Sequence, residues 1–138
     1  MSQTIMDSGP LVAWFSKRDS HHEWATRLID DLPIGALVCE AVLAEVCHLV
    51  AKDGVPAASV LKLVEQNDLV LASLAGDIPA IRALMERYKD APMDFADACV
   101  VRMAELNPET AVCTTDGHFR FFRKSSGETI ALLAPFAS

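Results

Sequence analysis

Residues 3–10, QTIMDSGP, join a short apolar segment to an acidic residue and then to a Ser-Gly-Pro turn signal. Glycine and proline commonly interrupt regular structure, so the apolar segment is expected to end where they begin. This pattern predicts a buried strand over residues 3–7 that presents Asp7 at its carboxyl end, followed by a helix over Leu11–Ser16. Asp7 also has a simpler interpretation, because aspartate is a common N-cap ahead of a proline in the first helical turn.

The alternation that begins here continues along the chain, with short apolar segments separated by amphipathic ones of helical period. This order is typical of an α/β fold with a mainly parallel central sheet, in which functional sites form beyond the carboxyl ends of the strands. Further strands are expected over Ala36–Cys39, Asp68–Leu71, Ala111–Thr114 and Thr129–Leu133, and further helices over His21–Leu32, Glu40–Lys52, Ala57–Gln66, Ile78–Tyr88 and Asp94–Leu106.

The length of 138 residues and the hydrophobic content of 51% predict one domain, residues 1–138, with a substantial core. The formal charge of −7 argues against a protein that coats nucleic acid by general electrostatics, but it permits a nuclease with a local basic strip. No apolar run is long enough to cross a bilayer, and the N-terminus has no signal-like pattern, so a cytoplasmic protein is expected.

The four cysteines all lie inside apolar stretches, and none is paired as CxxC. A structural zinc site or a secreted disulfide framework is therefore less favoured than four reduced thiols in the core. They are Cys39, Cys47, Cys99 and Cys113.

Three further acidic residues are distinguished by their positions, one after a predicted strand and two on the faces of predicted helices. Asp116 follows the strand predicted at 111–114, although the Asp-Gly pair there is also an ordinary turn signal. Glu45 borders the apolar stripe of its helix, where a partly exposed glutamate is the alternative. Asp97 lies within the apolar arc of its helix, and buried carboxylates are rare unless they are paired or bind metal.

Asp94 lies on the polar side of the same helix as Asp97, at the position of an N-cap, so the two residues also have an interpretation as a capping pair. If the fold gathers all four acids, their mutual repulsion calls for a cation. Magnesium and manganese prefer such oxygen ligands, and the bound ion activates water and stabilises charge on a phosphate. The set therefore indicates a divalent-metal site and phosphodiester chemistry.

Four segments resemble, in order and spacing, the motifs of the PIN-domain family, and most closely those of VapC-type toxins of bacterial toxin–antitoxin pairs. They are MDSGPLVAWF, VLAEVCHLV, MDFADACVVRMAE and TTDGHFRFFR, and together they span nearly the whole chain. The resemblance implies a PIN-like three-layer α/β/α sandwich, usually a homodimer, that acts as a Mg²⁺- or Mn²⁺-dependent endoribonuclease on RNA and is inhibited by a cognate antitoxin.

Carried over residue by residue, the resemblance makes Asp7, Glu45, Asp97 and Asp116 the catalytic acids and metal ligands. Thr114 matches a small hydroxyl residue that orients a carboxylate or phosphate, and Asp94 is expected to cap the helix or support Asp97. Many relatives carry another acid where this chain has His118, which puts a fifth ligand, and with it a well-formed second metal site, in doubt. An ordinary loop histidine is favoured for His118, and the alternatives are contact with phosphate or a part in acid–base steps.

Arg120, Arg123 and Lys124 follow closely after Asp116 and alternate with three phenylalanines. A basic strip with aromatic residues can hold single-stranded RNA through phosphate pairing and base stacking. The alternative is a solvated basic edge over core phenylalanines. We expect the phenylalanines to be mostly structural, and Arg120 or Arg123 to face the substrate.

Two rival interpretations stay open at this stage. One is a PIN-domain nuclease of RNA maturation or quality control that has no antitoxin. The other is a catalytically silent PIN scaffold that binds only protein. Manganese binding separates the second rival from the nuclease hypotheses, and a neighbouring antitoxin gene separates the first from a toxin.

Overall fold

A computed structural model describes residues 3–33 and 35–136 of the chain. Within these residues, five short strands form one sheet in the order β3-β2-β1-β4-β5, and every neighbouring pair is parallel. The expected α/β class and parallel sheet are therefore confirmed. The strands are β1 (Thr4–Met6), β2 (Ala36–Val38), β3 (Leu69–Leu71), β4 (Ala111–Cys113) and β5 (Leu132–Leu133).

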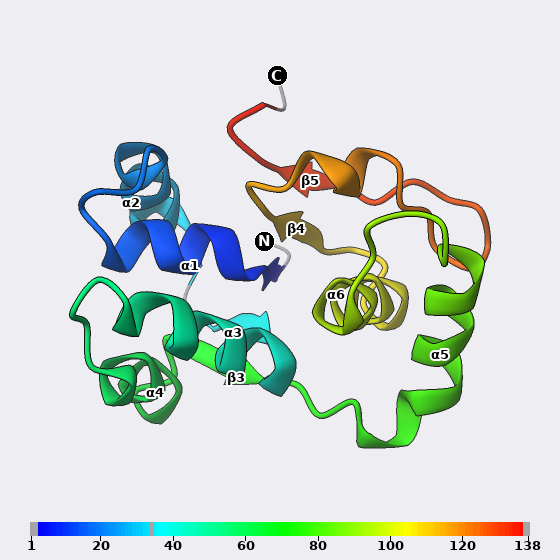
Figure 1. Cartoon of the computed structure of the whole chain (residues 1–138), viewed down its shortest axis with the longest axis horizontal. Coiled ribbons are helices and arrows are strands. Elements are labelled where there is room, and N and C mark those ends of the chain that lie inside the picture. The colour runs from blue at the N-terminus through cyan, green and yellow to red at the C-terminus, as the bar shows by residue number, and fades with distance from the viewer. Residues whose placement is uncertain (1–2, 34, 137–138) are drawn as a thin grey trace.

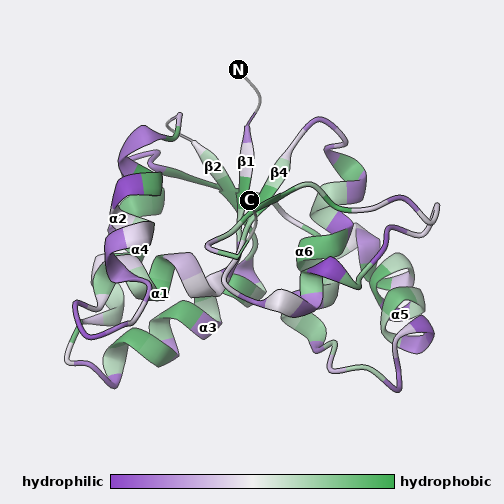
Figure 2. Cartoon of the chain, turned by 90° about the horizontal axis from the view of Figure 1, so that it is seen from above, coloured by the Kyte–Doolittle hydropathy of each residue, from purple (hydrophilic) through white to green (hydrophobic). Residues whose placement is uncertain are grey.

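Helices cover both faces of the sheet, which gives the expected three layers. Figures 1 and 2 show α1 to α4 gathered on one side of the strands, with α5 and α6 on the other. None of the helices in the described ranges is long and apolar enough to cross a membrane. The helices are α1 (Ser8–Phe15), α2 (His22–Asp31), α3 (Glu40–Ala51), α4 (Ala57–Glu65), α5 (Ile78–Arg87) and α6 (Phe95–Leu106).

The strands and α6 form the centre of the core. Ile5, Val38 and Val112 have no exposed surface, which explains why these segments read as short continuous apolar runs rather than alternating ones. Helix α6 packs on β1 and β4 and buries a row of mainly small residues, so its backbone approaches the sheet closely. This packing brings the first turn of α6 to the carboxyl ends of β1 and β4.

Two element boundaries differ from the sequence predictions, and two short helices are additional. Helix α1 begins at Ser8 instead of Leu11, because Pro10 falls in the first turn, where its missing N–H is not needed. Strand β5 is confined to Leu132–Leu133, since Thr129 instead pairs with Arg123 in an isolated antiparallel bridge. Two short 3-10 helices, η1 (Ala75–Asp77) and η2 (Gly117–Arg120), were not predicted. The other expected elements begin and end within one residue of their predicted bounds.

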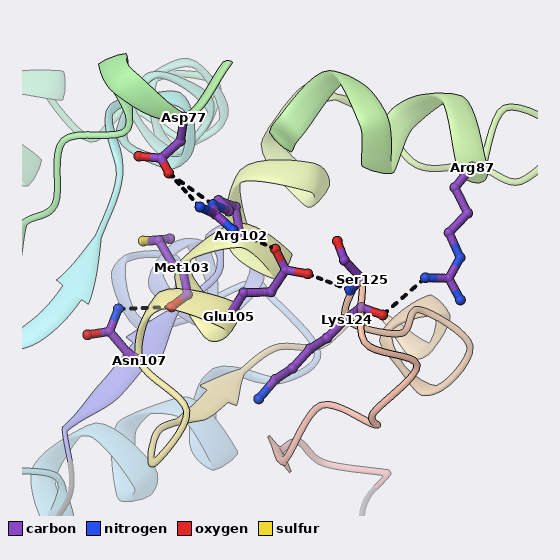
Figure 3. Close-up of polar contacts among 8 residues, drawn as sticks. All are labelled: Asp77, Arg87, Arg102, Met103, Glu105, Asn107, Lys124 and Ser125. Atoms are coloured by element: carbon purple, nitrogen blue, oxygen red, sulfur yellow. Dashed lines mark hydrogen bonds and ion pairs between the residues drawn. The ribbon is translucent and has the colours of Figure 1, made fainter. Parts of the chain in front are cut away.

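Charged side chains of α6 form hydrogen bonds with Asp77 and with the backbone of Ser125, as Figure 3 shows. The Arg102 guanidinium donates to Asp77 at 2.9 Å and to Glu105 at 3.1 Å, and Glu105 also accepts a hydrogen bond from the backbone N–H of Ser125. Arg102 is therefore committed to a structural network on the outer side of α6 and does not pair with the acids at the carboxyl ends of the strands.

Candidate active site

Asp7 and Thr114 extend the paired strands β1 and β4 by one residue each. Met6 is in register with Cys113, so the next residues stand side by side. The Thr114 hydroxyl donates to Asp7 Oδ2 at 2.7 Å and accepts from the Asp116 backbone N–H at 2.9 Å. Asp7 is 5% exposed and Thr114 is 0% exposed. A buried hydroxyl therefore links the first acid to the loop that carries the fourth.

The first turn of α1 lies directly against that loop. A β-carbon at Gly9 would collide with the side chain of Thr115, so glycine is required for this close approach. The contact holds the segment after Asp7 against the residue that precedes Asp116.

Glu45 reaches the same region from α3. Its Oε1 accepts a hydrogen bond from the Ser8 hydroxyl, and Ser8 directly follows Asp7. Glu45 is half-buried, whereas Glu40 is exposed on another side of the helix. The role of Ser8 was missed by sequence reasoning, which placed it in a turn; its position directly after the strand-end acid was the available signal.

Asp94 and Asp97 form a reciprocal capping box at the start of α6. The Asp97 backbone N–H donates to Asp94 Oδ1 at 2.8 Å, and the Asp94 backbone N–H donates to Asp97 Oδ2 at 3.1 Å. Asp97 is half-buried, which corrects the expectation of a buried carboxylate. Its side chain reaches back to the N-terminal end of α6, where it accepts the hydrogen bond from Asp94. Capping and a place in the acidic cluster are therefore compatible, because the cap engages only Oδ2.

Asp116 caps the short helix η2. Its Oδ1 accepts from the His118 backbone N–H at 2.9 Å and lies 2.7 Å from His118 Nδ1. The imidazole of His118 also stacks on Phe122. The turn interpretation of Asp116 is thus correct for its local structure, and His118 is oriented by two neighbours.

The four acids influence one another electrostatically, with Asp7 at their centre. Burial raises the pKa of Asp7 to about 6; the Thr114 hydrogen bond opposes the rise, and the charges of Glu45 and Asp116 add to it. Burial likewise raises the pKa of Asp97 well above its ordinary value, and the charges of Asp94 and Asp7 contribute. The charge of Asp7 is therefore coupled to those of Glu45, Asp97 and Asp116, each of which comes from a different element of the fold.

Of the four acids, Asp116 lies 2.7 Å from His118 Nδ1, and the other three have no lysine or arginine partner among the described residues. Over the same residues, no three His, Cys, Asp or Glu side chains lie close enough to hold one ion together. The oxygen donors, the burial and the uncompensated charge fit a hard divalent cation such as Mg²⁺ or Mn²⁺.

The aromatic residues after Asp116 divide into two groups. Phe119 and Phe122 are 1% exposed and pack edge to face, so they belong to the core as expected. Phe121 is 73% exposed and departs from that expectation. The spacing contained the signal, because residues three apart in a tight helix share a side and Phe121 falls on another.

Arg120 lies beside the acidic loop. Its guanidinium stacks over Phe136 at 4.7 Å from the ring centroid, and a β-carbon on Gly117 would lie 3.4 Å from its Nη2. Arg123 is more constrained, because its backbone N–H donates to the Tyr88 hydroxyl at 2.6 Å. Arg120 is therefore the exposed cation next to Asp116.

The Thr114 hydroxyl is expected to contribute measurably to stability. A Thr114→Val substitution keeps the side-chain shape but leaves a buried carboxylate and the Asp116 N–H without their partner, which costs about 1–3 kcal/mol. Urea unfolding measures the loss, and Thr114→Ser, which keeps the hydroxyl, is expected to recover most of it. A valine variant as stable as the wild type would show that the hydrogen bonds of the Thr114 hydroxyl do not contribute to the free energy of unfolding.

A family model supplies the decisive comparison. The PIN domain model matches residues 4–124, a span that includes Asp7, Glu45, Asp97 and Asp116. The chain belongs to the PIN-domain family. No curated protein matches it.

The PIN fold is also recognisable among solved structures. The crystal structure of VapC20 from Mycobacterium tuberculosis, a sarcin–ricin loop cleaving toxin, matches this chain with a TM-score of 0.76 at 17% identity. The match covers 83% of this chain and 91% of VapC20. At that identity the likeness shows a common fold, and it confirms the PIN-like architecture that the motifs implied.

Proposed function

We propose that this PIN-domain protein is a metal-dependent endoribonuclease, and that it is the toxin of a toxin–antitoxin pair acting on cytoplasmic RNA. The observation that carries the proposal is a set of four acids near the carboxyl ends of β1 and β4, of which Asp7, Glu45 and Asp97 have no lysine or arginine partner among the described residues. Asp7, at the centre of this set, is buried with a raised pKa. A buried carboxylate of this kind gains stability from a cation. The likeness to the VapC20 toxin supports the same activity.

Each acid has a distinct role in this proposal. Asp7 and Asp97 hold the metal, with Thr114 orienting Asp7 and Asp94 fixing the first turn of α6 that carries Asp97. Glu45 and Asp116 complete the metal site or position the attacking water. When bound, Mg²⁺ or Mn²⁺ supplies a water of lowered pKa and stabilises charge on the phosphate. His118 keeps Asp116 in place through its two contacts.

The RNA is proposed to lie along η2 and the residues that follow it. Arg120 stands beside the acidic loop and pairs with a phosphate, with Arg123 as a second cation nearby. Phe121 offers an exposed ring on which an unpaired base can stack. A loop substrate, such as the one that VapC20 cleaves, presents unpaired bases of this kind.

Phe121→Ala is expected to weaken RNA binding about tenfold, because base stacking on an aromatic side chain is worth about 1–3 kcal/mol. The dissociation constant is measured by fluorescence anisotropy on a short single-stranded RNA in EDTA, so that cleavage does not interfere. Phe121→Trp is expected to bind at least as tightly as the wild type. An alanine variant with unchanged affinity would remove Phe121 from the RNA path.

The test of the enzymatic proposal combines activity with metal binding. RNA cleavage is expected in Mg²⁺ or Mn²⁺, absent in EDTA, and strongly reduced in Asp97→Asn. Calorimetry is expected to detect Mn²⁺ binding to the wild type that the variant lacks. A chain that binds no manganese and cleaves no RNA would be the silent scaffold instead.

The antitoxin requires a genetic test. We propose that a cognate antitoxin covers the acidic cluster and that two copies of the chain form a homodimer. Expression of the chain alone is expected to arrest growth, and co-expression of the neighbouring gene is expected to relieve the arrest. Cleavage without toxicity, and with no such neighbour, would favour a nuclease of RNA maturation.

A further inference from the structure

Two buried cysteines line one cavity near the first turns of α3 and α6, and the proposed reaction uses neither. Cys39 directly follows β2 and is the N-cap residue of α3, whereas Cys99 lies in the second turn of α6. Each is 2% exposed. Both side chains line the same cavity, although sixty positions separate them in the sequence.

The pair is reachable by small molecules. Cys39 and Cys99 both line a cavity of about 170 Å³, together with Glu40, Ile78 and Phe95, of which the last three are exposed. A water molecule occupies about 30 Å³ of the liquid. A cavity of this size therefore admits an oxidant as small as hydrogen peroxide, although a bulky thiol reagent is excluded from the buried sulfurs.

The surroundings of Cys39 favour its reaction over that of the other thiols. The neighbouring Cys99 lowers the pKa of Cys39 despite burial, and the backbone N–H groups at the start of α3 reinforce the effect. By contrast, burial raises the pKa of Cys113 to about 12. The thiolate is the reactive form of cysteine, so Cys39 is a better nucleophile than Cys113.

We propose that Cys39 and Cys99 are a reversible oxidation site that forms a disulfide with hydrogen peroxide. The Cys39 sulfur attacks one peroxide oxygen, the O–O bond breaks, and a sulfenic acid and one water result. The Cys99 sulfur then attacks the Cys39 sulfur, the S–O bond breaks, and a second water leaves with the Cys99 proton. The two cysteines lose two electrons and peroxide gains them; a dithiol reductant reverses the change.

The disulfide would act on the acidic cluster through α6. Bond formation draws the sulfurs to about 2 Å, closer than any non-bonded contact between them. Cys39 marks the start of α3, which carries Glu45, and Cys99 lies two residues after Asp97 on α6. A shift of about 1 Å in a catalytic group can cost about a hundredfold in rate. We therefore expect the oxidised chain to cleave RNA at least about tenfold more slowly, an effect that rests on the proposed function.

The disulfide is tested without reference to activity. The full chain is treated with hydrogen peroxide, and peptide mapping under non-reducing conditions is expected to find Cys39 linked to Cys99, with Cys113 still reduced. Dithiothreitol restores the free thiols. Cys39→Ala and Cys99→Ala each abolish the link, whereas Cys47→Ala, which alters a thiol outside this pair, leaves it intact. Absence of the linked peptide from the oxidised wild type would overturn the proposal.

The effect on cleavage is measured on the same samples. Oxidised wild type is expected to lose activity and to regain it with dithiothreitol, while Cys39→Ala and Cys99→Ala stay active throughout. A linked peptide with unchanged cleavage would overturn the regulatory role. A linked peptide in a chain that cleaves no RNA even when reduced would contradict the proposed function and leave the oxidation site standing.

Discussion

Replacing Asp7 with asparagine is expected to lower the rate of RNA cleavage by about 10³-fold. Asp7 is 5% exposed and stands at the centre of the acidic cluster, where its charge contributes to holding a divalent cation. Asparagine has the same size and still accepts the Thr114 hydrogen bond, but it is neutral. Loss of metal-assisted stabilisation worth several kcal/mol corresponds to a rate change of this order. Single-turnover cleavage of a labelled RNA in Mg²⁺ measures it.

The matched control is Asp53→Asn, which removes an exposed carboxylate from the loop after α3. This variant is expected to cleave RNA at the wild-type rate, because the change in net charge is the same but lies outside the acidic cluster. If Asp7→Asn retained cleavage within about tenfold of the wild type, Asp7 would not hold the metal.

The elements of this fold were predictable because each strand is a continuous apolar run and each helix has a regular apolar stripe. Segments that depend on tertiary contacts were not predictable in the same way. Thr129 has the character of a strand residue, yet it pairs with Arg123. Helix η2 arises from the capping of its backbone by Asp116, which a local pattern describes only as a turn.

The acids of the site could be selected from the sequence because strand ends and helix faces distinguish them from other carboxylates. The burial and hydrogen bonds of these acids could not be predicted from the sequence. Asp97 was expected to be buried, but the capping box with Asp94 directs its side chain toward the N-terminal end of α6. The cavity that Cys39 and Cys99 share could not be predicted from the sequence, since it depends on how α3 and α6 pack.

Without divalent metal, Asp7→Asn is expected to be more stable than the wild type by about 3 kcal/mol at about pH 7.5. Burial, opposed by the Thr114 hydrogen bond and reinforced by neighbouring charges, raises the pKa of Asp7 from 3.8 to about 6. The folded state therefore binds this proton more tightly than the unfolded state. The resulting stability is present in full below pH 3.8 and is lost as the pH rises through about 6. Urea unfolding in EDTA measures the difference.

The advantage of the variant should shrink toward zero at about pH 4, because a protonated Asp7 resembles asparagine. Manganese should reverse the order at neutral pH. The wild type gains about 4.1 kcal/mol at a metal concentration about a thousand times its dissociation constant, which exceeds the variant's advantage, whereas the variant gains little. Asp53→Asn is expected to follow the wild type in every condition. A variant no more stable than the wild type in EDTA would mean that the burial of Asp7 does not destabilise the folded protein.

The two conditions together would separate a metal ligand from an ordinary helix cap. A metal ligand such as Asp7 lowers the stability of the metal-free protein and raises it when metal is bound, whereas a helix cap stabilises the fold in both conditions.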